Sequence, residues 1–92
     1  ILPHGVNGII IHGDAVIGQG VKILHQVTIG LKNGGSGTPF IGDGVTLNAG
    51  SKIIGGLTIG SGAEVGANAV VTKDIPANSI AVGIPAKVIR SK

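Results

Sequence analysis

The stretch IGDGVTLNAGSKIIGGLTIGSGAEVGANAVVTKDI, residues 41–75, begins with Ile41 and carries a branched aliphatic residue at every sixth position up to Val71. The series extends toward the N-terminus through residues 11, 17, 23 and 29, and only Gly35 interrupts it. A second series of mostly small or apolar residues follows four positions after the first, with Asn33 as its exception. Glycine often follows a first-series residue directly, as at Gly42 and Gly60. The chain is therefore built from internal repeats of six residues each.

A period of six fits neither regular pattern of a single helix or strand. A helix needs apolar residues about 3.6 positions apart, and a half-buried strand needs them at every second position. Short strands separated by tight corners do fit, because glycine, asparagine and aspartate permit the positive φ angles of such corners. In a solenoid of this kind each coil buries the face of its neighbour. The sequence therefore predicts an all-β, single-stranded parallel β-helix.

The repeat also predicts which residues stack. Three six-residue segments close one triangular coil, so residues 18 apart lie in neighbouring coils. Ile17, Ile41 and Ile59 then fall into one column if residues 31–40 bulge outward by one such segment. That stretch, LKNGGSGTPF, breaks both series and has the glycines and proline of a loop. A loop on a regular solenoid is often functional, and a tolerated insertion is the alternative.

The six-residue series stops after Ile75-Pro76. We expect two parts: residues 1–76 form the coils, with the loop excursion at 31–40, and residues 77–92 form a C-terminal tail that caps the last coil. Within this tail, Gly83-Ile84-Pro85 predicts a turn followed by a short extended segment.

The composition argues against several kinds of site. The chain has no cysteine, which removes disulfides, thiolate zinc sites and a cysteine nucleophile. A net charge of +3 and a single aromatic residue, Phe40, give little support to nucleic-acid binding. No apolar run approaches membrane-spanning length, and neither a secretory segment nor a phosphate-binding glycine motif occurs. We expect no nucleic-acid partner and no membrane span.

The six-residue motif, an aliphatic residue, glycine, two variable positions, a small residue and one further position, resembles that of the hexapeptide-repeat acyltransferases. The ending VGIPAKVI at 82–89 is similar to that family's C-terminal signature. His4, the isoleucines at 9–11, ILHQVTIG at 23–30, the glycine-rich loop and LNAGSKIIG at 47–55 resemble the serine acetyltransferase branch, which includes relatives that acetylate polysaccharides. The resemblance implies a left-handed β-helix and a cytoplasmic, acetyl-CoA-dependent O-acetyltransferase. It also implies a homotrimer with active sites between neighbouring subunits.

His4, in LPHG, matches the catalytic histidine of the serine acetyltransferase pattern. A neutral imidazole can take the proton of a small-molecule hydroxyl acceptor as its oxygen attacks a thioester carbonyl. Because the chain has neither cysteine nor a G-x-S-x-G elbow, direct transfer from acetyl-CoA is favoured over a covalent acyl-enzyme. His25 could face the same cleft and bind the acceptor or support His4. The alternative for His25 is a surface histidine on the solenoid.

Two departures from the pattern bear on the acceptor. Serine acetyltransferases carry an aspartate directly before the first histidine, where this chain has Pro3. They carry a second catalytic histidine near the end of the loop, where this chain has Thr38-Pro39-Phe40. Both L-serine and a sugar therefore stay open as the acceptor, while acetyl transfer itself is not removed.

For coenzyme A, the resemblance assigns Gly30, Ala49 and Ala67 to the wall of a groove. Small side chains there let the backbone approach the pantetheine arm closely, although the same residues also suit tight corners. Three cations are candidate contacts for the phosphates, and a solvated charged surface is the alternative: Lys73, Lys87 and Arg90. No metal is expected.

Two other classes of function remain open. A zinc enzyme of the γ-carbonic anhydrase type shares this solenoid and uses three histidine ligands, but the spacing of His4, His12 and His25 does not resemble that family's. A non-catalytic scaffold, such as an ice-binding module, would need ranks of threonine that the chain does not clearly show. Apolar residues at non-core positions, such as Ile10 and Ile54, favour association of subunits.

Overall fold

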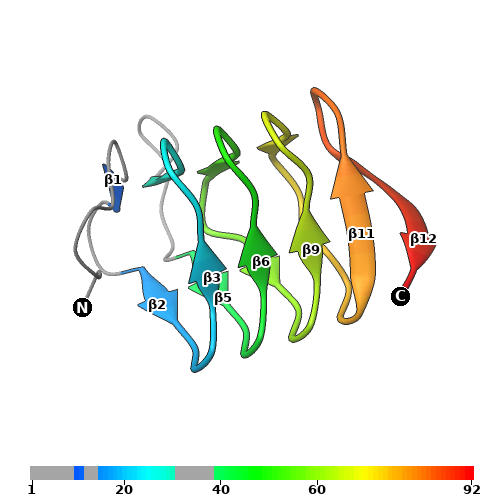
Figure 1. The fold of residues 1–92 in the computed structure, drawn as a ribbon, viewed down its shortest axis with the longest axis horizontal. Helices are drawn as coiled ribbons and strands as arrows, with labels where there is room; N and C mark the ends of the chain where they lie inside the picture. The colour runs from blue at the N-terminus through cyan, green and yellow to red at the C-terminus, as the bar shows by residue number, and fades with distance from the viewer. Residues whose placement is uncertain (1–9, 12–14, 31–38) are drawn as a thin grey trace.

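The computed structural model describes residues 10–11, 15–30 and 39–92. Within these ranges the regular structure is β-strand, and the strands are short, mostly of two or three residues (Figure 1). They are β1 (Ile10–Ile11), β2 (Val16–Ile17), β3 (Lys22–Ile23), β4 (Thr28–Gly30), β5 (Phe40–Ile41), β6 (Thr46–Leu47), β7 (Lys52–Ile54), β8 (Thr58–Ile59), β9 (Glu64–Val65), β10 (Val70–Val71), β11 (Ser79–Val82) and β12 (Lys87–Ser91).

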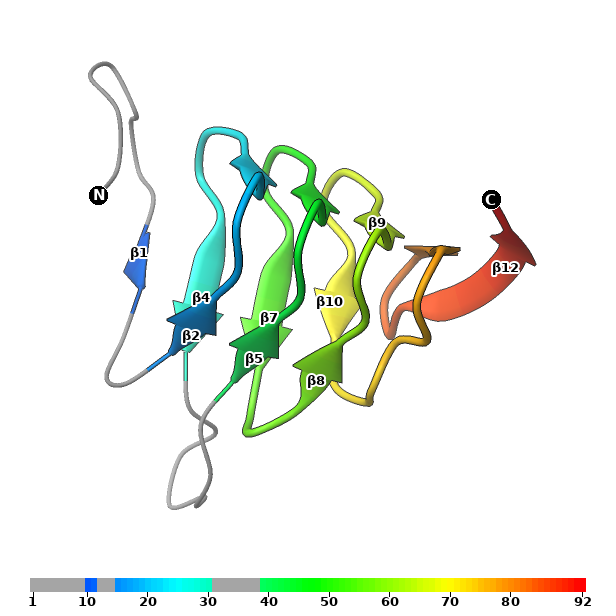
Figure 2. The same cartoon turned by 90° about the horizontal axis from the view of Figure 1, so that it is seen from below.

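The strands form three sheets, which are the three sides of a prism (Figures 1 and 2). Sheet A has the order β1-β4-β7-β10, sheet B has β2-β5-β8, and sheet C has β12-β11-β9-β6-β3. Every pairing is parallel except that of β11 with β12. From β1 to β11 successive strands belong to different sheets, so the chain turns a corner after each of them, whereas β12 returns beside β11 in sheet C. The expected parallel β-helix is confirmed.

The registers reproduce the predicted columns of first-series residues. In sheet B, Ile17 pairs with Ile41 and Ile41 pairs with Ile59. The second pair is 18 residues apart and the first is 24 apart, so that coil is longer by six residues, as expected. Sheets A and C hold the matching columns Ile11–Ile29–Ile53–Val71 and Ile23–Leu47–Val65–Ala81.

The core lies along the prism axis and consists of both residue series. Aliphatic first-series residues from Ile29 to Val71 are almost completely buried. Second-series residues such as Val27, Val45 and Ala63 are fully buried as well, and Ser51 occupies one of their positions. Burial of this aliphatic area is what stabilises a coil too small to fold alone.

Two boundaries differ from the sequence prediction. β5 begins at Phe40, which was expected to lie in the loop; Phe40 pairs with Val16 and Thr58 and has its side chain half exposed. The position before a first-series residue points outward, so the six-residue rule places no demand on it. The parallel stacking also continues beyond residue 76, because β11 pairs with β9 and Ala81 is fully buried.

The reason for the second difference is a shorter last coil. Ile59 bridges to Ile75 and Val65 pairs with Ala81, each pair 16 residues apart instead of 18. Val71 still pairs with Ile53 at 18 residues, so the two missing residues fall between Val71 and Ile75. Counting in sixes beyond Val71 therefore misses the inward position of Ala81.

Candidate functional site

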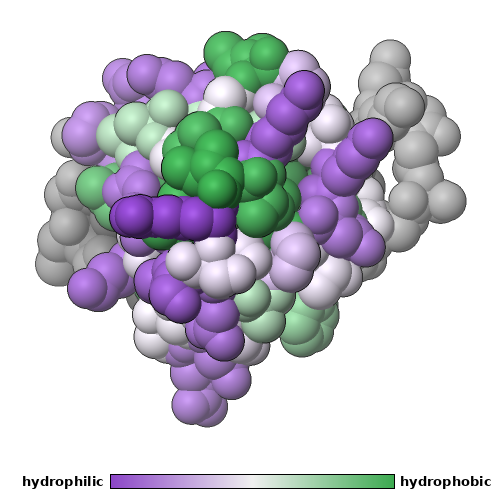
Figure 3. Space-filling model, turned by 90° about the vertical axis from the view of Figure 1, so that its right-hand side faces the viewer, coloured by the Kyte–Doolittle hydropathy of each residue, from purple (hydrophilic) through white to green (hydrophobic). Residues whose placement is uncertain are grey.

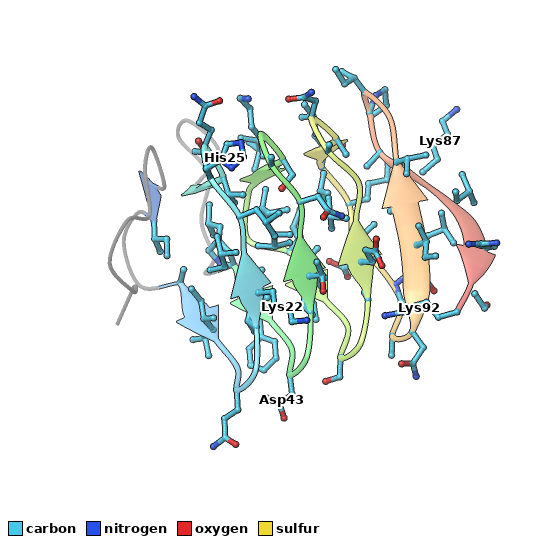
Figure 4. All side chains as sticks on the ribbon, viewed as in Figure 1. Lys22, His25, Asp43, Lys87 and Lys92 are labelled. Carbon is cyan, nitrogen blue, oxygen red and sulfur yellow. The ribbon has the colours of Figure 1, made fainter. Side chains whose placement is uncertain are left out.

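Three of the candidate residues stack at one corner of the prism, which we call the C–A corner because the chain passes there from sheet C to sheet A. His25, Ala49 and Ala67 are the first turn residues after β3, β6 and β9. The N–H of Gly50 donates to the carbonyl of His25 at 3.1 Å, and the N–H of Asn68 donates to the carbonyl of Ala49 at 2.9 Å. His25 and Ala67 are exposed, and Ala49 is half-buried. Figure 4 places His25 at the upper edge, at the end of β3.

The tightness of this corner follows from the residue after each of these three. Gln26, Gly50 and Asn68 all have positive φ, at 59°, 75° and 60°. Glycine adopts this conformation freely and asparagine tolerates it, so each coil can turn within two residues. The Asn48 side chain fixes the corner further, because its Nδ2 donates to the carbonyl of Val65 at 2.9 Å. Along this corner the larger residues His25, Gln26 and Asn68 stand beside the small residues Ala49, Gly50 and Ala67.

The equivalent B–C corner, between sheets B and C, differs in how its backbone is satisfied. There the N–H of Gln19 donates to Asp43 Oδ1 at 2.8 Å, and the N–H of Asp43 donates to Ser61 Oγ at 3.2 Å. Each turn residue thus caps the amide of the coil before it. At the C–A corner the equivalent side chains are those of Ala49 and Ala67, which have no acceptor atom. The amides of His25 and Ala49 therefore lack the cap that Asp43 and Ser61 supply at the B–C corner.

The tail closes the C-terminal end of the same corner. The side chain of Val82 lies over Gly66, where an added Cβ would come within 2.7 Å of Val82 Cγ1. The N–H of Val70 donates to the carbonyl of Gly83 at 3.0 Å, and its carbonyl accepts from the N–H of Ala86 at 2.7 Å. Lys87 pairs with Val82, so it begins β12 next to this corner (Figure 4). The docking of this turn on Val70 was not predicted from the sequence, although the end of the six-residue series was a signal of it.

The other candidates lie elsewhere. Gly30 is buried at the opposite edge of sheet A, where its carbonyl accepts from the N–H of Gly55 at 3.0 Å. Lys73 is exposed beside that edge, two residues after β10. The roughly five residues that cross sheet A between its edges span about 16 Å. Arg90 is exposed in β12 and pairs with Ile80 of sheet C. It therefore lies neither at the C–A corner nor at the opposite side of sheet A.

The structure does not test the remaining expectations about histidine and metal chemistry. His4, His12 and residues 31–38 of the loop lie outside the described residues. In the part of the chain that is described, no three histidine, cysteine or carboxylate side chains come together as a metal site would require. Over the same residues, none of the structure is a helix with the length and apolarity to cross a membrane.

Comparison with known proteins supports the resemblance. The family model described as bacterial transferase hexapeptide (six repeats) matches residues 38–73. Serine acetyltransferase 2 of Arabidopsis thaliana is 48% identical over 92 residues, which is 98% of this chain and 28% of that protein. The crystal structure of serine acetyltransferase from Brucella abortus in complex with coenzyme A superposes with a TM-score of 0.86 at 33% identity. The superposed region covers 94% of this chain and 38% of the Brucella abortus chain.

A soybean serine acetyltransferase complexed with serine gives a TM-score of 0.85 at 43% identity, over 91% of this chain and 37% of that one. The chain thus spans about a third of the length of these relatives, as the covered shares of 28%, 38% and 37% show. Fold and repeat together define a left-handed β-helix of the hexapeptide-repeat type. The chain carries the hexapeptide repeat of the bacterial transferases over residues 38–73, and over nearly its whole length it resembles the serine acetyltransferases.

Proposed function

We propose that the chain is the acetyl-transferring β-helix of an acetyl-CoA-dependent O-acetyltransferase. The acceptor is a small molecule with a hydroxyl group, either L-serine or a sugar. The observation that carries the proposal is the C–A corner, where small side chains leave the amides of His25 and Ala49 without the side-chain caps seen at the B–C corner. The proposal is also supported by the likeness of the chain to serine acetyltransferases, one solved with coenzyme A and another with serine.

The C–A corner fits one long, amide-bearing ligand. Pantetheine carries amide carbonyls that accept hydrogen bonds, and the N–H groups of the corner are donors that a small side chain leaves approachable. Lys87 begins β12 beside the same corner and is exposed, so it is the candidate for a phosphate contact. We propose Ala49, Ala67 and Lys87 as the coenzyme A wall on this subunit.

Gly30 and Lys73 fit a second surface of the same ligand site, whereas Arg90 lies in β12 beside neither surface and stays a prediction. An extended ligand at the C–A corner would have to cross the face of sheet A to reach Gly30 and Lys73 on the same subunit. A site between two subunits resolves this, since one copy supplies its C–A corner and the next its opposite edge. The separation of the candidates is therefore consistent with the homotrimer that the family resemblance implies, which stays a prediction together with the cytoplasmic location.

The chemistry we propose is direct transfer. His4 acts as the general base that removes the acceptor's hydroxyl proton while the oxygen attacks the thioester carbonyl, and the thiol of coenzyme A leaves. Backbone N–H groups at corners are the candidate donors to the oxyanion. His25 lies at the C–A corner, where its exposed imidazole is placed to bind the acceptor or to support His4.

The test is release of free thiol from acetyl-CoA with a panel of acceptors that includes L-serine and several sugars. His4→Ala should lower kcat by about 10²- to 10⁴-fold, the contribution of a positioned general base. His12→Ala is the matched control and should keep the activity. Full activity of His4→Ala would show that the base is another group. Activity that depends on stoichiometric zinc would favour the carbonic anhydrase alternative instead.

A further inference from the structure

Lys73 lies where the chain passes from sheet A to sheet B, at the edge of sheet A that also holds Gly30. We call this the A–B corner; it includes residues 55–57, which connect β7 to β8 in Figure 2, and residues 72–74 after β10. Hydrophilic side chains project from several sides of the C-terminal end of the prism (Figure 3). Exposure alone therefore does not distinguish Lys73 from an ordinary surface lysine. The hydrogen bonding of its coil does.

The regular coils show how this corner joins sheet B. The N–H of Val16 donates to the carbonyl of Pro39 at 2.9 Å, and the N–H of Phe40 donates to the carbonyl of Leu57 at 2.9 Å. Pro39 and Leu57 each precede the first-series residue of sheet B by two positions, and both are buried. In these coils one residue thus packs inward while its carbonyl accepts the amide of the coil before it.

The last coil replaces that carbonyl with a side chain. Ile59 bridges to Ile75, so the position two residues before the sheet is Lys73. The regular pattern would pair the N–H of Thr58 with the carbonyl of Lys73. This N–H donates instead to Asp74 Oδ1 at 2.8 Å. The carboxylate of Asp74 has therefore taken the place of the Lys73 carbonyl.

The length of the connection accounts for the exchange. Residues 54–58 connect Ile53 to Ile59 in the coil before, whereas only residues 72–74 connect Val71 to Ile75. All three residues of the shorter connection are exposed, and none of them turns back into the core as the longer connection does. Lys73 therefore points into solvent at a position where the regular coils bury a side chain.

We propose that Asp74 is a positioning residue, which acts on coenzyme A through Lys73. Its carboxylate accepts from the N–H of Thr58, an amide that needs an acceptor, and so leaves the Lys73 peptide free to turn outward. The ammonium group of Lys73 then contacts a phosphate of coenzyme A at the A–B corner. Without the carboxylate, the amide of Thr58 would recruit the Lys73 carbonyl and draw the lysine inward. This inference rests on the proposed function, because it concerns the same coenzyme A site.

The experiment is isothermal titration calorimetry with coenzyme A and with pantetheine, which lacks the phosphates. Lys73→Ala should weaken the binding of coenzyme A about fivefold and leave that of pantetheine unchanged. Asp74→Ala should weaken coenzyme A about threefold, again without an effect on pantetheine. The double variant should bind no more weakly than Lys73→Ala, because Asp74 acts through the lysine.

Asp74→Asn separates the hydrogen bond from the charge. Asparagine and alanine are both neutral, but the asparagine oxygen can still accept from the N–H of Thr58. Asp74→Asn should therefore bind coenzyme A about threefold more tightly than Asp74→Ala. Asp43→Ala is the matched control at the B–C corner, where Asp43 Oδ1 accepts from the N–H of Gln19 at the same distance of 2.8 Å. It should leave the binding of both ligands unchanged.

Equal binding of coenzyme A by Asp74→Ala and Asp74→Asn would overturn the proposal. Equal losses for coenzyme A and pantetheine would do the same, since they would indicate a general distortion of the coil. Thiol release from acetyl-CoA by the wild-type protein is measured alongside. If thiol is released and the two Asp74 variants do not differ, only the positioning role is wrong. If the wild-type protein neither binds coenzyme A nor releases thiol, the proposed function is wrong as well.

Discussion

The B–C and C–A corners turn the chain in the same way but satisfy their backbone differently. At the B–C corner, Asp43 and Ser61 cap the amides of Gln19 and Asp43. At the C–A corner, Ala49 and Ala67 occupy the equivalent positions and can cap nothing. Two amides of the B–C corner thus have side-chain caps, whereas the corresponding amides of the C–A corner have none from Ala49 and Ala67. If the proposed coenzyme A wall lies at the C–A corner, its binding edge is the one that lacks the capping side chains present at the B–C corner.

The largest effect should come from adding a methyl group at the crowded B–C corner. In Gly60→Ala, the new Cβ would lie 2.6 Å from Ala77 Cα and 2.8 Å from the carbonyl carbon of Pro76, so the backbone of the next coil must move. We expect a loss of about 2–3 kcal/mol in the free energy of unfolding, measured by urea denaturation. Gly66→Ala is the matched change at the C–A corner, where the crowded atom is Val82 Cγ1. It should cost about 1 kcal/mol, since a partly exposed side chain can shift. Equal losses would contradict the difference between the corners.

The next prediction concerns ligand binding at the C–A corner. Ala67→Ser copies Ser61, whose Oγ accepts from the N–H of Asp43, and should place a hydroxyl beside the amide of Ala49. If that amide binds coenzyme A, KM for acetyl-CoA should rise about fivefold to tenfold, the weight of one hydrogen bond, without a loss of stability. Ser61→Ala at the B–C corner should leave KM unchanged. An unchanged KM in Ala67→Ser would remove the Ala49 amide from the coenzyme A wall.

The converse experiment removes a side-chain cap from the B–C corner. Asp43→Ala removes the acceptor for the N–H of Gln19, and the free energy of unfolding should fall by about 0.5–1 kcal/mol in urea denaturation. Because Asp43 lies on the corner away from the proposed site, steady-state kinetics should show no change in KM for acetyl-CoA. A change in KM with intact folding would mean that the ligand reaches the B–C corner.

The smallest effect is expected at a buried serine next to the C–A corner. Ser51 follows Gly50 and is fully buried, and its Oγ has no hydrogen-bond partner among the described residues. Ser51→Ala should therefore raise the free energy of unfolding by about 0.5 kcal/mol, because an unpaired buried hydroxyl is costly. Ser79→Ala is the control: its Oγ donates to the carbonyl of Ala77 at 3.3 Å, so alanine should not stabilise there. A loss of stability in Ser51→Ala would indicate that the hydroxyl has a partner.

The inward columns were predictable from the sequence because burial demands an aliphatic residue at each repeat. The column Ile17–Ile41–Ile59 lies where counting in sixes places it. Corner lengths carry no such demand, and the two residues lost between Val71 and Ile75 left no apolar signal. For the same reason the count could not show that Gly83 and Ala86 bond to Val70.

The candidate site was predictable only in part. Ala49 and Ala67 are 18 residues apart, so their stacking follows from the repeat, and His25 joins them once the coil with the loop is counted as six residues longer. That Gly30 lies on the other edge of sheet A required the strand assignment. The different capping of the two corners depends on side-chain hydrogen bonds between coils, which no single six-residue motif contains.

The parallel registers join residues only 16 to 24 positions apart, so no parallel strand pair ties one end of the described chain to the other. Each coil is stabilised by its immediate neighbours, and such an array can unravel from its ends one turn at a time. Amide hydrogen exchange should therefore be slowest in the middle coils, near Leu47 and Ile53, and faster toward both termini. A molecule of this kind has a gradient of lifetimes along its axis instead of one lifetime for the whole.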